Sequence, residues 1–319
     1  MDRRDGEARL STAYLFPGQG AQSPGFLHRL PEHPLVQDTL AEAGAVLGMD
    51  PATLDTEAAL ASTMAVQLAA LIAGVAVMRA LAHEGVRVDA AAGLSVGAFG
   101  AAVACGALSF ADALPIVKLR GESMQNAFPR GYGMAAIIGL EEQQVTDLLG
   151  SLGGAESQIY LASINAPTQI VISGADRALD AAVELARRAG ARQAGRMAVS
   201  VPSHSPLLDP VAAQLAAAFA SIQLQPPQVP YIRNRRARLV NDAAGIRDDL
   251  IYNVAHSVRW YDSAALLYEL GVRLFIELPP GQVLSRLARQ AFPEARAIAV
   301  DDTQLGSIVL LSARSRPPS

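Results

Sequence analysis

The sequence predicts an α/β protein in which a small unit interrupts a larger one. Three observations support this. The chain has 319 residues, of which 51% are hydrophobic and 18% charged, enough for one large domain or two domains. Short apolar runs alternate with stretches of helical periodicity. Between them, 132–199 has the order strand-helix-strand-strand-helix-strand of a ferredoxin-like unit. We therefore expect a discontinuous large domain of 11–131 and 200–311, with disordered ends at 1–10 and 312–319.

The first half of the large unit begins with a buried strand, 13–16, which the turn residues Pro17 and Gly18 end. A helix with one apolar face follows over 35–47. The next helix, 64–82, is apolar on nearly every face and must therefore be buried. The periodicity then predicts a strand at 86–93 and helices at 96–108 and 110–127.

The predicted insert and the segment after it are also read from periodicity and turn residues. In the insert we expect strands at 134–140, 159–164, 169–173 and 192–201, with helices at 141–150 and 177–189. After it, Ser205 and Pro206 have the N-cap and first-turn pattern of a helix start. A late strand at 272–278 leads to the turn Pro279-Pro280-Gly281 and a helix from about 283.

Composition excludes several classes of protein. The formal net charge of −4 gives no bulk attraction to nucleic acid or anionic lipid. A single cysteine, Cys105, excludes an intramolecular disulfide and a multi-cysteine metal site, and fits a reducing cytoplasm. The longest uncharged run, 90–111, is rich in alanine and glycine, with Ser95 inside it, so no membrane span is expected. The charged start of the chain has no apolar core typical of a signal peptide.

A serine motif stands between a predicted strand and a predicted helix. Residues 93–97 read GLSVG and match G-x-S-x-G, in which small residues allow a sharp turn that exposes the serine hydroxyl. At such a helix start the N–H of Val96 can stabilise an oxyanion. Alone the pattern is weak, because an alanine- and glycine-rich helix start produces it by chance. A tightly packed helix start therefore stays open beside a nucleophilic Ser95.

A serine nucleophile needs a base, and the chain has five histidines. His204 lies at a strand-to-helix junction, the same rim of an α/β sheet as the serine, and His256 is its rival. The other three, at 28, 33 and 83, are read as surface residues. On the predicted helix 110–127, Arg120 either faces inward toward a carboxylate or snorkels at the surface. The Gly-Gln-Gly segment around Gln19 fits no phosphate-loop spacing, and its glycines allow close backbone approach to a ligand or oxyanion.

Taken together, these segments resemble the malonyl-CoA:acyl-carrier-protein transacylase family over about 12–311. The motifs that carry the resemblance are FPGQGAQ at 16–22, the serine motif, FADA at 110–113 with LRG at 119–121, NAPTQIVISG at 165–174, VSVPSH at 199–204 and VRW at 258–260. The resemblance implies an α/β-hydrolase-like large domain with a ferredoxin-like insert, in agreement with the pattern above.

The resemblance also implies roles for individual residues. Ser95 would carry the malonyl group as an ester, and His204 would be its general base. The N–H groups of Gln19 and Val96 would form the oxyanion hole. Arg120 would hold the malonyl carboxylate. The carbonyl that orients the histidine in this family maps to Asn253. No metal or bound cofactor is expected.

Three departures from the family pattern point to one branch. Leu94 replaces the usual histidine, the acidic residue after the elbow is missing at Ala98 and Phe99, and the late turn reads Pro279-Pro280-Gly281. These features resemble the malonate decarboxylase epsilon subunit, which moves malonyl from malonyl-CoA to a decarboxylase's own carrier protein. That carrier has a phosphoribosyl-dephospho-CoA arm. We therefore expect malonate decarboxylase subunits as possible partners, with a malonyltransferase of fatty-acid or polyketide synthesis as the alternative.

Two questions stay open at this point. A serine hydrolase or thioesterase shares the elbow and base but has no use for Arg120, and a non-catalytic scaffold would only dock the carrier. An acyl carrier protein is acidic in this family, so it needs a basic surface. The densest positive segment holds Arg233, Arg235, Arg236 and Arg238, which are either that dock or a solvated basic loop.

Overall fold

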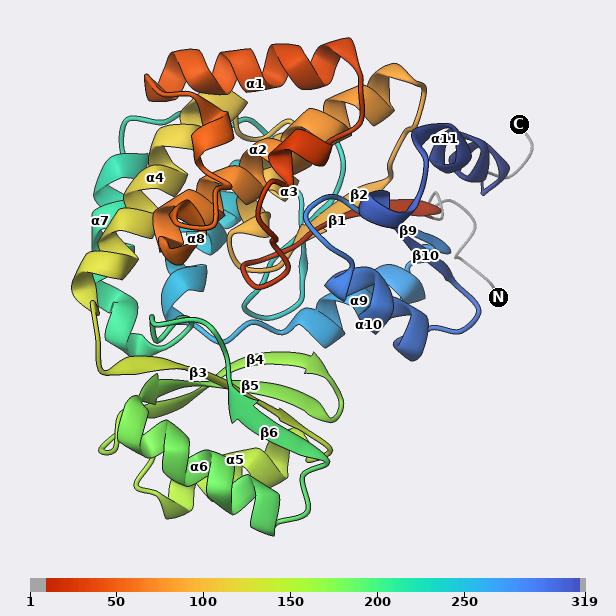
Figure 1. Cartoon of the computed structure of the whole chain (residues 1–319). Helices are drawn as coiled ribbons and strands as arrows, with labels where there is room; N and C mark the ends of the chain where they lie inside the picture. Colours follow the sequence, from red (N-terminus) through yellow and green to blue (C-terminus); the bar gives the residue numbers. More distant parts are fainter. Residues whose placement is uncertain (1–9, 316–319) are drawn as a thin grey trace.

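The computed structural model describes residues 10–315 and contains two sheets, one above the other in Figure 1. The larger sheet has six strands in the order β10-β9-β1-β2-β7-β8, and the smaller has four in the order β4-β5-β3-β6. The prediction of an α/β large domain with a ferredoxin-like small domain is confirmed. Predicted disorder at 1–9 and 316–319 lies outside the described residues.

The centre of the large sheet is β1 (Thr12–Phe16), whose five residues are all buried. It pairs in parallel with β2 (Ala90–Gly93) and with β9 (Leu274–Glu277), and β9 pairs with β10 (Arg296–Ala299). The far edge is a short antiparallel pair, β7 (Tyr231–Ile232) and β8 (Leu239–Val240). Because parallel strands run the same way, β1 and β2 end at one edge of the sheet, and the serine motif follows β2 there.

Helices cover both faces of the large sheet (Figure 1). They are α1 (Pro34–Leu47), α2 (Thr63–His83), α3 (Gly97–Ala104), α4 (Phe110–Ala127), α7 (Asp209–Phe219), α8 (Ala243–Tyr252), α9 (Trp260–Glu269), α10 (Val283–Ala291) and α11 (Leu305–Arg314). Among the described residues, α2 alone is long and apolar enough to cross a membrane, and 83% of its most apolar window is buried. It packs against α1, α3 and α4 as a core helix.

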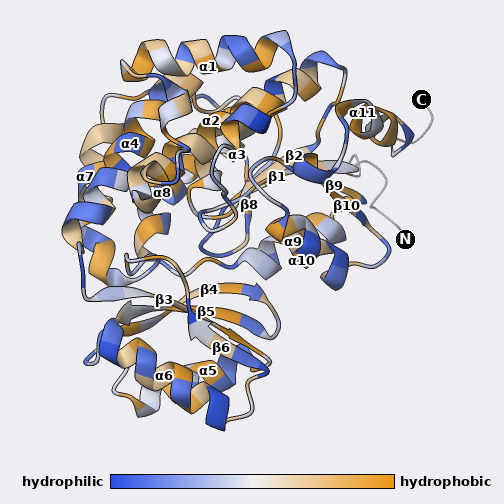
Figure 2. Cartoon of the chain, viewed as in Figure 1, coloured by the Kyte–Doolittle hydropathy of each residue, from blue (hydrophilic) through white to orange (hydrophobic). Residues whose placement is uncertain are grey.

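The small sheet consists of β3 (Tyr132–Ile138), β4 (Ile159–Ala166), β5 (Gln169–Ala175) and β6 (Gln193–Arg196), all paired antiparallel. Both helices of this unit, α5 (Glu142–Ser151) and α6 (Asp176–Arg188), lie on the side away from the large domain (Figure 1). Figure 2 shows hydrophobic and hydrophilic residues alternating along α6, as expected for a helix with one face on a sheet. The other face of the sheet is turned toward the large domain.

Main-chain hydrogen bonds join the two units at β4. The N–H of Val258 donates to the carbonyl of Ala162 at 2.9 Å, and the N–H of Ile164 donates to the carbonyl of Val258 at 2.9 Å. Val258 therefore adds one parallel bridge to the edge of the small sheet, opposite Ser163.

Several sequence predictions differ from the structure at their edges. The predicted strand 192–201 is β6 alone, because its later residues leave the sheet and lead toward His204. The prediction of a disordered tail from residue 312 was wrong for its first residues, because α11 continues to Arg314 and Ser312 is buried. The two-residue strands β7 and β8 were not predicted. The proposed domain boundaries at 131/132 and 199/200 stay predictions.

Candidate active site

The serine motif forms a sharp turn between β2 and α3. Ser95 has a φ of +57°, a left-handed conformation that is rare for residues other than glycine. Gly93 and Gly97 make the turn possible, because a Cβ on Gly93 would lie 2.1 Å from the carbonyl carbon of Gly97. A Cβ on Gly97 would lie 2.2 Å from the carbonyl oxygen of Phe16. The motif therefore has the backbone geometry of a nucleophile elbow as well as its sequence pattern.

Ser95 and His204 contact each other across 109 positions of sequence. The Nε2 of His204 lies 2.9 Å from the Oγ of Ser95, and its Nδ1 lies 2.7 Å from the carbonyl oxygen of Asn253. A carbonyl can only accept, so Nδ1 carries the ring proton and Nε2 is left to accept from the serine hydroxyl. Asn253 follows the last residue of α8, which places this carbonyl. The three residues have the relative positions that the resemblance implies.

The surroundings of His204 keep its imidazole neutral. Burial and, to a lesser extent, the positive charge of Arg120 together lower the pKa of His204 from 6.5 to about 4, against the hydrogen bond to Asn253. A neutral ring at physiological pH is the form that accepts a proton from serine.

Arg120 is completely buried, so the alternative of a surface arginine is wrong. Its Nη1 donates to Oε1 of Gln67 at 2.7 Å, and its Nη2 lies 3.2 Å from both the Oγ of Ser95 and the Oδ1 of Asn253. Among the described residues it forms no salt bridge, and its Nε has no hydrogen-bond partner. Burial lowers its pKa. The site thus holds a buried cation beside Ser95, and no carboxylate within residues 10–315 pairs with it.

A cleft of about 190 Å³ opens beside the serine, between the large domain and the small sheet. Ser95, His204, Gln19, Val96 and Gln67 line it, and most of the remaining wall is apolar, with Met124, Met134, Val171, Met197 and Val199 among its residues. Arg120 lies behind this wall, and Gln67 connects it to the cleft. Gln67 was missed from the sequence, although it is a lone amide within the apolar run of α2.

The N–H groups expected to form an oxyanion hole belong to the turns after β1 and β2. Gln19 and Val96 both line the cleft, and among the described residues neither backbone N–H has a protein acceptor. Val96 immediately precedes α3, where the positive end of the helix dipole adds to the attraction for an anion. Both groups are available to a ligand oxygen.

Two other predicted candidates have different surroundings. His256, the rival base, has its Nε2 3.0 Å from Arg235 and its Nδ1 2.8 Å from the carbonyl of Tyr252, so it does not contact Ser95. Arg233 is only 17% exposed in its side chain and pairs with Asp248, which leaves it little free surface for a docking partner.

His33, His83 and Glu84 form the one group of three potential metal ligands among the described residues, away from this cleft. The Nδ1 of His33 accepts the N–H of Leu35 at 3.1 Å as the N-cap of α1. The ring proton is therefore on Nε2, the nitrogen that faces Glu84 at 3.5 Å, so that nitrogen is not free to bind a metal. The cluster is a helix cap whose imidazole faces a carboxylate.

Comparisons with known proteins agree with this geometry. The family model described as "Acyl transferase domain" matches residues 13–308. The malonyl CoA-acyl carrier protein transacylase of Salmonella typhimurium is 37% identical over 297 residues, covering 91% of this chain and 96% of that protein.

Solved structures agree as well. The malonyl CoA-acyl carrier protein transacylase of Coxiella burnetii has a TM-score of 0.90 at 34% identity, covering 96% of this chain and 98% of that one. A malonyl-transacylase solved in complex with its type II polyketide acyl carrier protein has a TM-score of 0.89 at 33% identity, covering 96% and 100%. With its serine elbow, paired histidine and matching family model, this chain belongs to the acyl transferase family and is an acyltransferase.

Proposed function

We propose that this acyltransferase moves malonyl from malonyl-CoA to the thiol of an acyl carrier protein through a malonyl-Ser95 ester. The observation that carries the proposal is the buried guanidinium of Arg120, which lies 3.2 Å from the Ser95 hydroxyl without an anionic partner. Burying an unpaired charge is unfavourable because the charge loses its hydration. A substrate carboxylate that reaches Arg120 supplies the missing charge partner and so recovers part of that free energy. The names of the relatives, malonyl CoA-acyl carrier protein transacylases, support the same substrate.

The two half-reactions use one proton relay. The Oγ of Ser95 attacks the thioester carbonyl while its proton moves to Nε2 of His204, and the N–H groups of Gln19 and Val96 stabilise the oxyanion. Collapse breaks the C–S bond, and His204 returns the proton to the CoA thiolate. The carrier thiol then attacks the malonyl ester, gives its proton to His204, and Ser95 recovers it as the leaving hydroxyl.

A labelling experiment tests the covalent step. Radioactive malonyl-CoA is expected to label the wild-type protein stoichiometrically at Ser95, and adding a holo carrier protein is expected to discharge the label. Ser95→Ala is the control and is expected to take up none. A serine hydrolase would release free malonate in water without any carrier, and a scaffold that only docks the carrier would not be labelled.

For the biological setting, we place the transferase in fatty-acid or polyketide synthesis. The similar proteins named above are malonyl CoA-acyl carrier protein transacylases, and one malonyl-transacylase was solved with its type II polyketide carrier protein. They support this alternative better than the malonate decarboxylase branch favoured from the sequence. Leu94 and the Pro279-Pro280-Gly281 turn remain the features behind the decarboxylase reading. Rates with a phosphopantetheine carrier and with a phosphoribosyl-dephospho-CoA carrier separate the two.

The single buried cysteine supports a cytoplasmic location.

The carrier dock is proposed at the exposed end of the basic segment. Arg236 and Arg238 are exposed and line a surface groove with Arg259 and Ser257, whereas Arg235 is held by Asp248 and His256. We expect Arg236→Glu with Arg238→Glu to raise the KM for an acidic carrier about tenfold and to leave the KM for malonyl-CoA within about twofold. Equal effects on both substrates would contradict this dock.

A further inference from the structure

The strained backbone of Ser95 is held by a side chain from another part of the chain. The N–H of Ser95 donates to Oδ1 of Asn234 at 2.9 Å. Asn234 is 2% exposed and lies two residues after the end of β7, the strand that pairs with β2. A left-handed residue persists only where its surroundings hold it, and this is the hydrogen bond made by the serine's own N–H.

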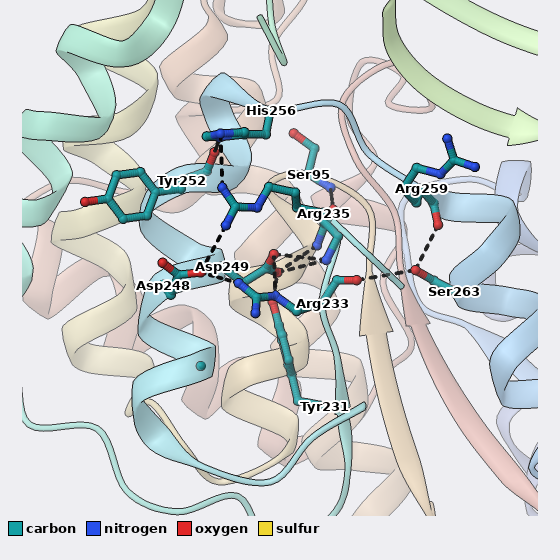
Figure 3. Close-up of polar contacts among 12 residues, drawn as sticks. Ser95, Tyr231, Arg233, Arg235, Asp248, Asp249, Tyr252, His256, Arg259 and Ser263 are labelled. Atoms are coloured by element: carbon teal, nitrogen blue, oxygen red, sulfur yellow. Dashed lines mark hydrogen bonds and ion pairs between the residues drawn. The ribbon is translucent and has the colours of Figure 1, made fainter. Parts of the chain in front are cut away.

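Asn234 is in turn oriented by a buried carboxylate. Asp249, 1% exposed, accepts the backbone N–H of Asn234 at 3.0 and 3.1 Å and its Nδ2 at 3.1 Å. The hydroxyl of Tyr231 donates to the same carboxylate at 2.7 Å, and Arg233 lies 4.0 Å away. Figure 3 shows these contacts meeting at Asp249. Since Asp249 accepts from Nδ2, the amide oxygen of Asn234 must face Ser95, and the amide cannot flip without losing both contacts.

The helix α8 supports both Ser95 and His204. Asp249 lies in α8, and Asn253, four residues later, follows its last turn. The N–H of Asn253 donates to the carbonyl of Asp249, and the carbonyl of Asn253 holds Nδ1 of His204 at 2.7 Å. The backbone of Ser95 and the ring of His204 are thus both held in place by adjacent turns at the end of α8.

We propose that Asn234 and Asp249 are positioning residues that, through α8, set the distance between the nucleophile and its base. Neither touches the reacting atoms; Asn234 acts on the backbone of Ser95, and Asp249 acts on Asn234. The proposal rests on Ser95 as the proposed nucleophile. Because an error of about 1 Å in such a contact reduces a rate about a hundredfold, loss of the tether is expected in the acylation step and not in binding.

The first test compares Asn234→Ala with wild type and with Asp248→Asn. Asp248 is the neighbouring carboxylate on α8, which pairs with Arg233 and Arg235 but does not contact Asn234. We expect Asn234→Ala to lower the single-turnover rate constant of Ser95 acylation at saturating malonyl-CoA by about 10- to 100-fold, with the half-saturating concentration changed by less than about twofold. Asp248→Asn is expected to stay within about twofold of wild type. Equal acylation rates in all three would overturn the proposal.

The second test, Asn234→Asp, has a signature that a purely structural role does not produce. The new carboxyl would lie beside Asp249, and two carboxylates so close share one proton. With that proton on residue 234, the variant still donates to Asp249 and still accepts from Ser95. The facing Arg233 and Tyr231 are the same in both proteins. We therefore expect near wild-type acylation at low pH and an added loss as pH rises, where wild type is flat. Parallel profiles would refute the tether.

A third readout separates failure of this inference from failure of the proposed substrate. Phenylmethylsulfonyl fluoride reacts with an activated serine and needs no malonyl group. If wild type reacts with it but not with malonyl-CoA, the substrate assignment fails while positioning stays measurable by the same reagent. If Asn234→Ala loses thermal stability yet sulfonylates Ser95 at the wild-type rate, Asn234 is structural only and the proposal is wrong.

Discussion

Replacing Arg120 with alanine tests the substrate assignment most directly. In the free protein Arg120 donates to Gln67, Ser95 and Asn253, which are all uncharged. The loss of these three hydrogen bonds in Arg120→Ala affects every acyl substrate alike. Only a substrate with a carboxylate loses a charge partner as well. Breaking a buried charge pair costs about 2–5 kcal/mol, which is roughly a 30- to 5000-fold loss in kcat/KM for malonyl transfer.

The assay compares malonyl-CoA and acetyl-CoA with the same carrier protein. The ratio of their kcat/KM values cancels effects on the elbow and on folding, so it isolates the carboxylate contact. We expect Arg120→Ala to collapse this ratio toward one. Arg120→Lys is expected to restore only part of it, since an ammonium cannot make the bidentate contact of a guanidinium. An unchanged malonyl preference in Arg120→Ala would refute the assignment and favour the serine-hydrolase reading.

Four further predictions follow from burial and charge. Because burial lowers the pKa of His204 from 6.5 to about 4, acylation of the free enzyme should stay constant from pH 8 to about pH 5 and fall only near pH 4 in a stopped-flow pH series. The unfolded chain binds that proton more tightly, so the free energy of unfolding from urea titrations should decrease as pH falls from 6.5 to 4. Gln67→Glu would give Arg120 an internal anion at the 2.7 Å contact, so malonyl kcat/KM should drop at least tenfold while acetyl transfer changes little in the same discharge assay. Burial raises the pKa of Cys105 to about 12, so iodoacetamide should leave it unmodified at pH 8 by mass spectrometry until the chain is unfolded.

The parts of the fold that follow from local pattern could be predicted from the sequence. The bounds of α4 were predicted at both ends, because Ser109 caps the helix and the periodicity continues to Ala127. The antiparallel small sheet follows from the spacing of its apolar strands and helices. Ser95 could be identified because the glycines that its turn requires are visible as letters.

Features that depend on distant contacts could not be predicted in this way. Nothing near Arg233 in the sequence indicates that Asp248 neutralises it, so a dense positive segment was read as one surface. Asn234 lies within that same segment, and its two partners, Ser95 and Asp249, come from other elements. Arg120 was ambiguous because helical periodicity gives a face but not what that face meets.

The hydrogen bonds of Val258 to Ala162 and Ile164 have a consequence for which acyl chains can enter the cleft. Swinging the small sheet away would break both main-chain bonds and expose their donors and acceptors, at about 0.5–1.5 kcal/mol each, besides parting β4 from α9. These contacts hold the small sheet at one distance from the large domain and so define the width of the cleft in this structure. An acyl chain too bulky for a cleft of about 190 Å³ has to separate these contacts to enter, so the bridge at Val258 disfavours bulky substrates.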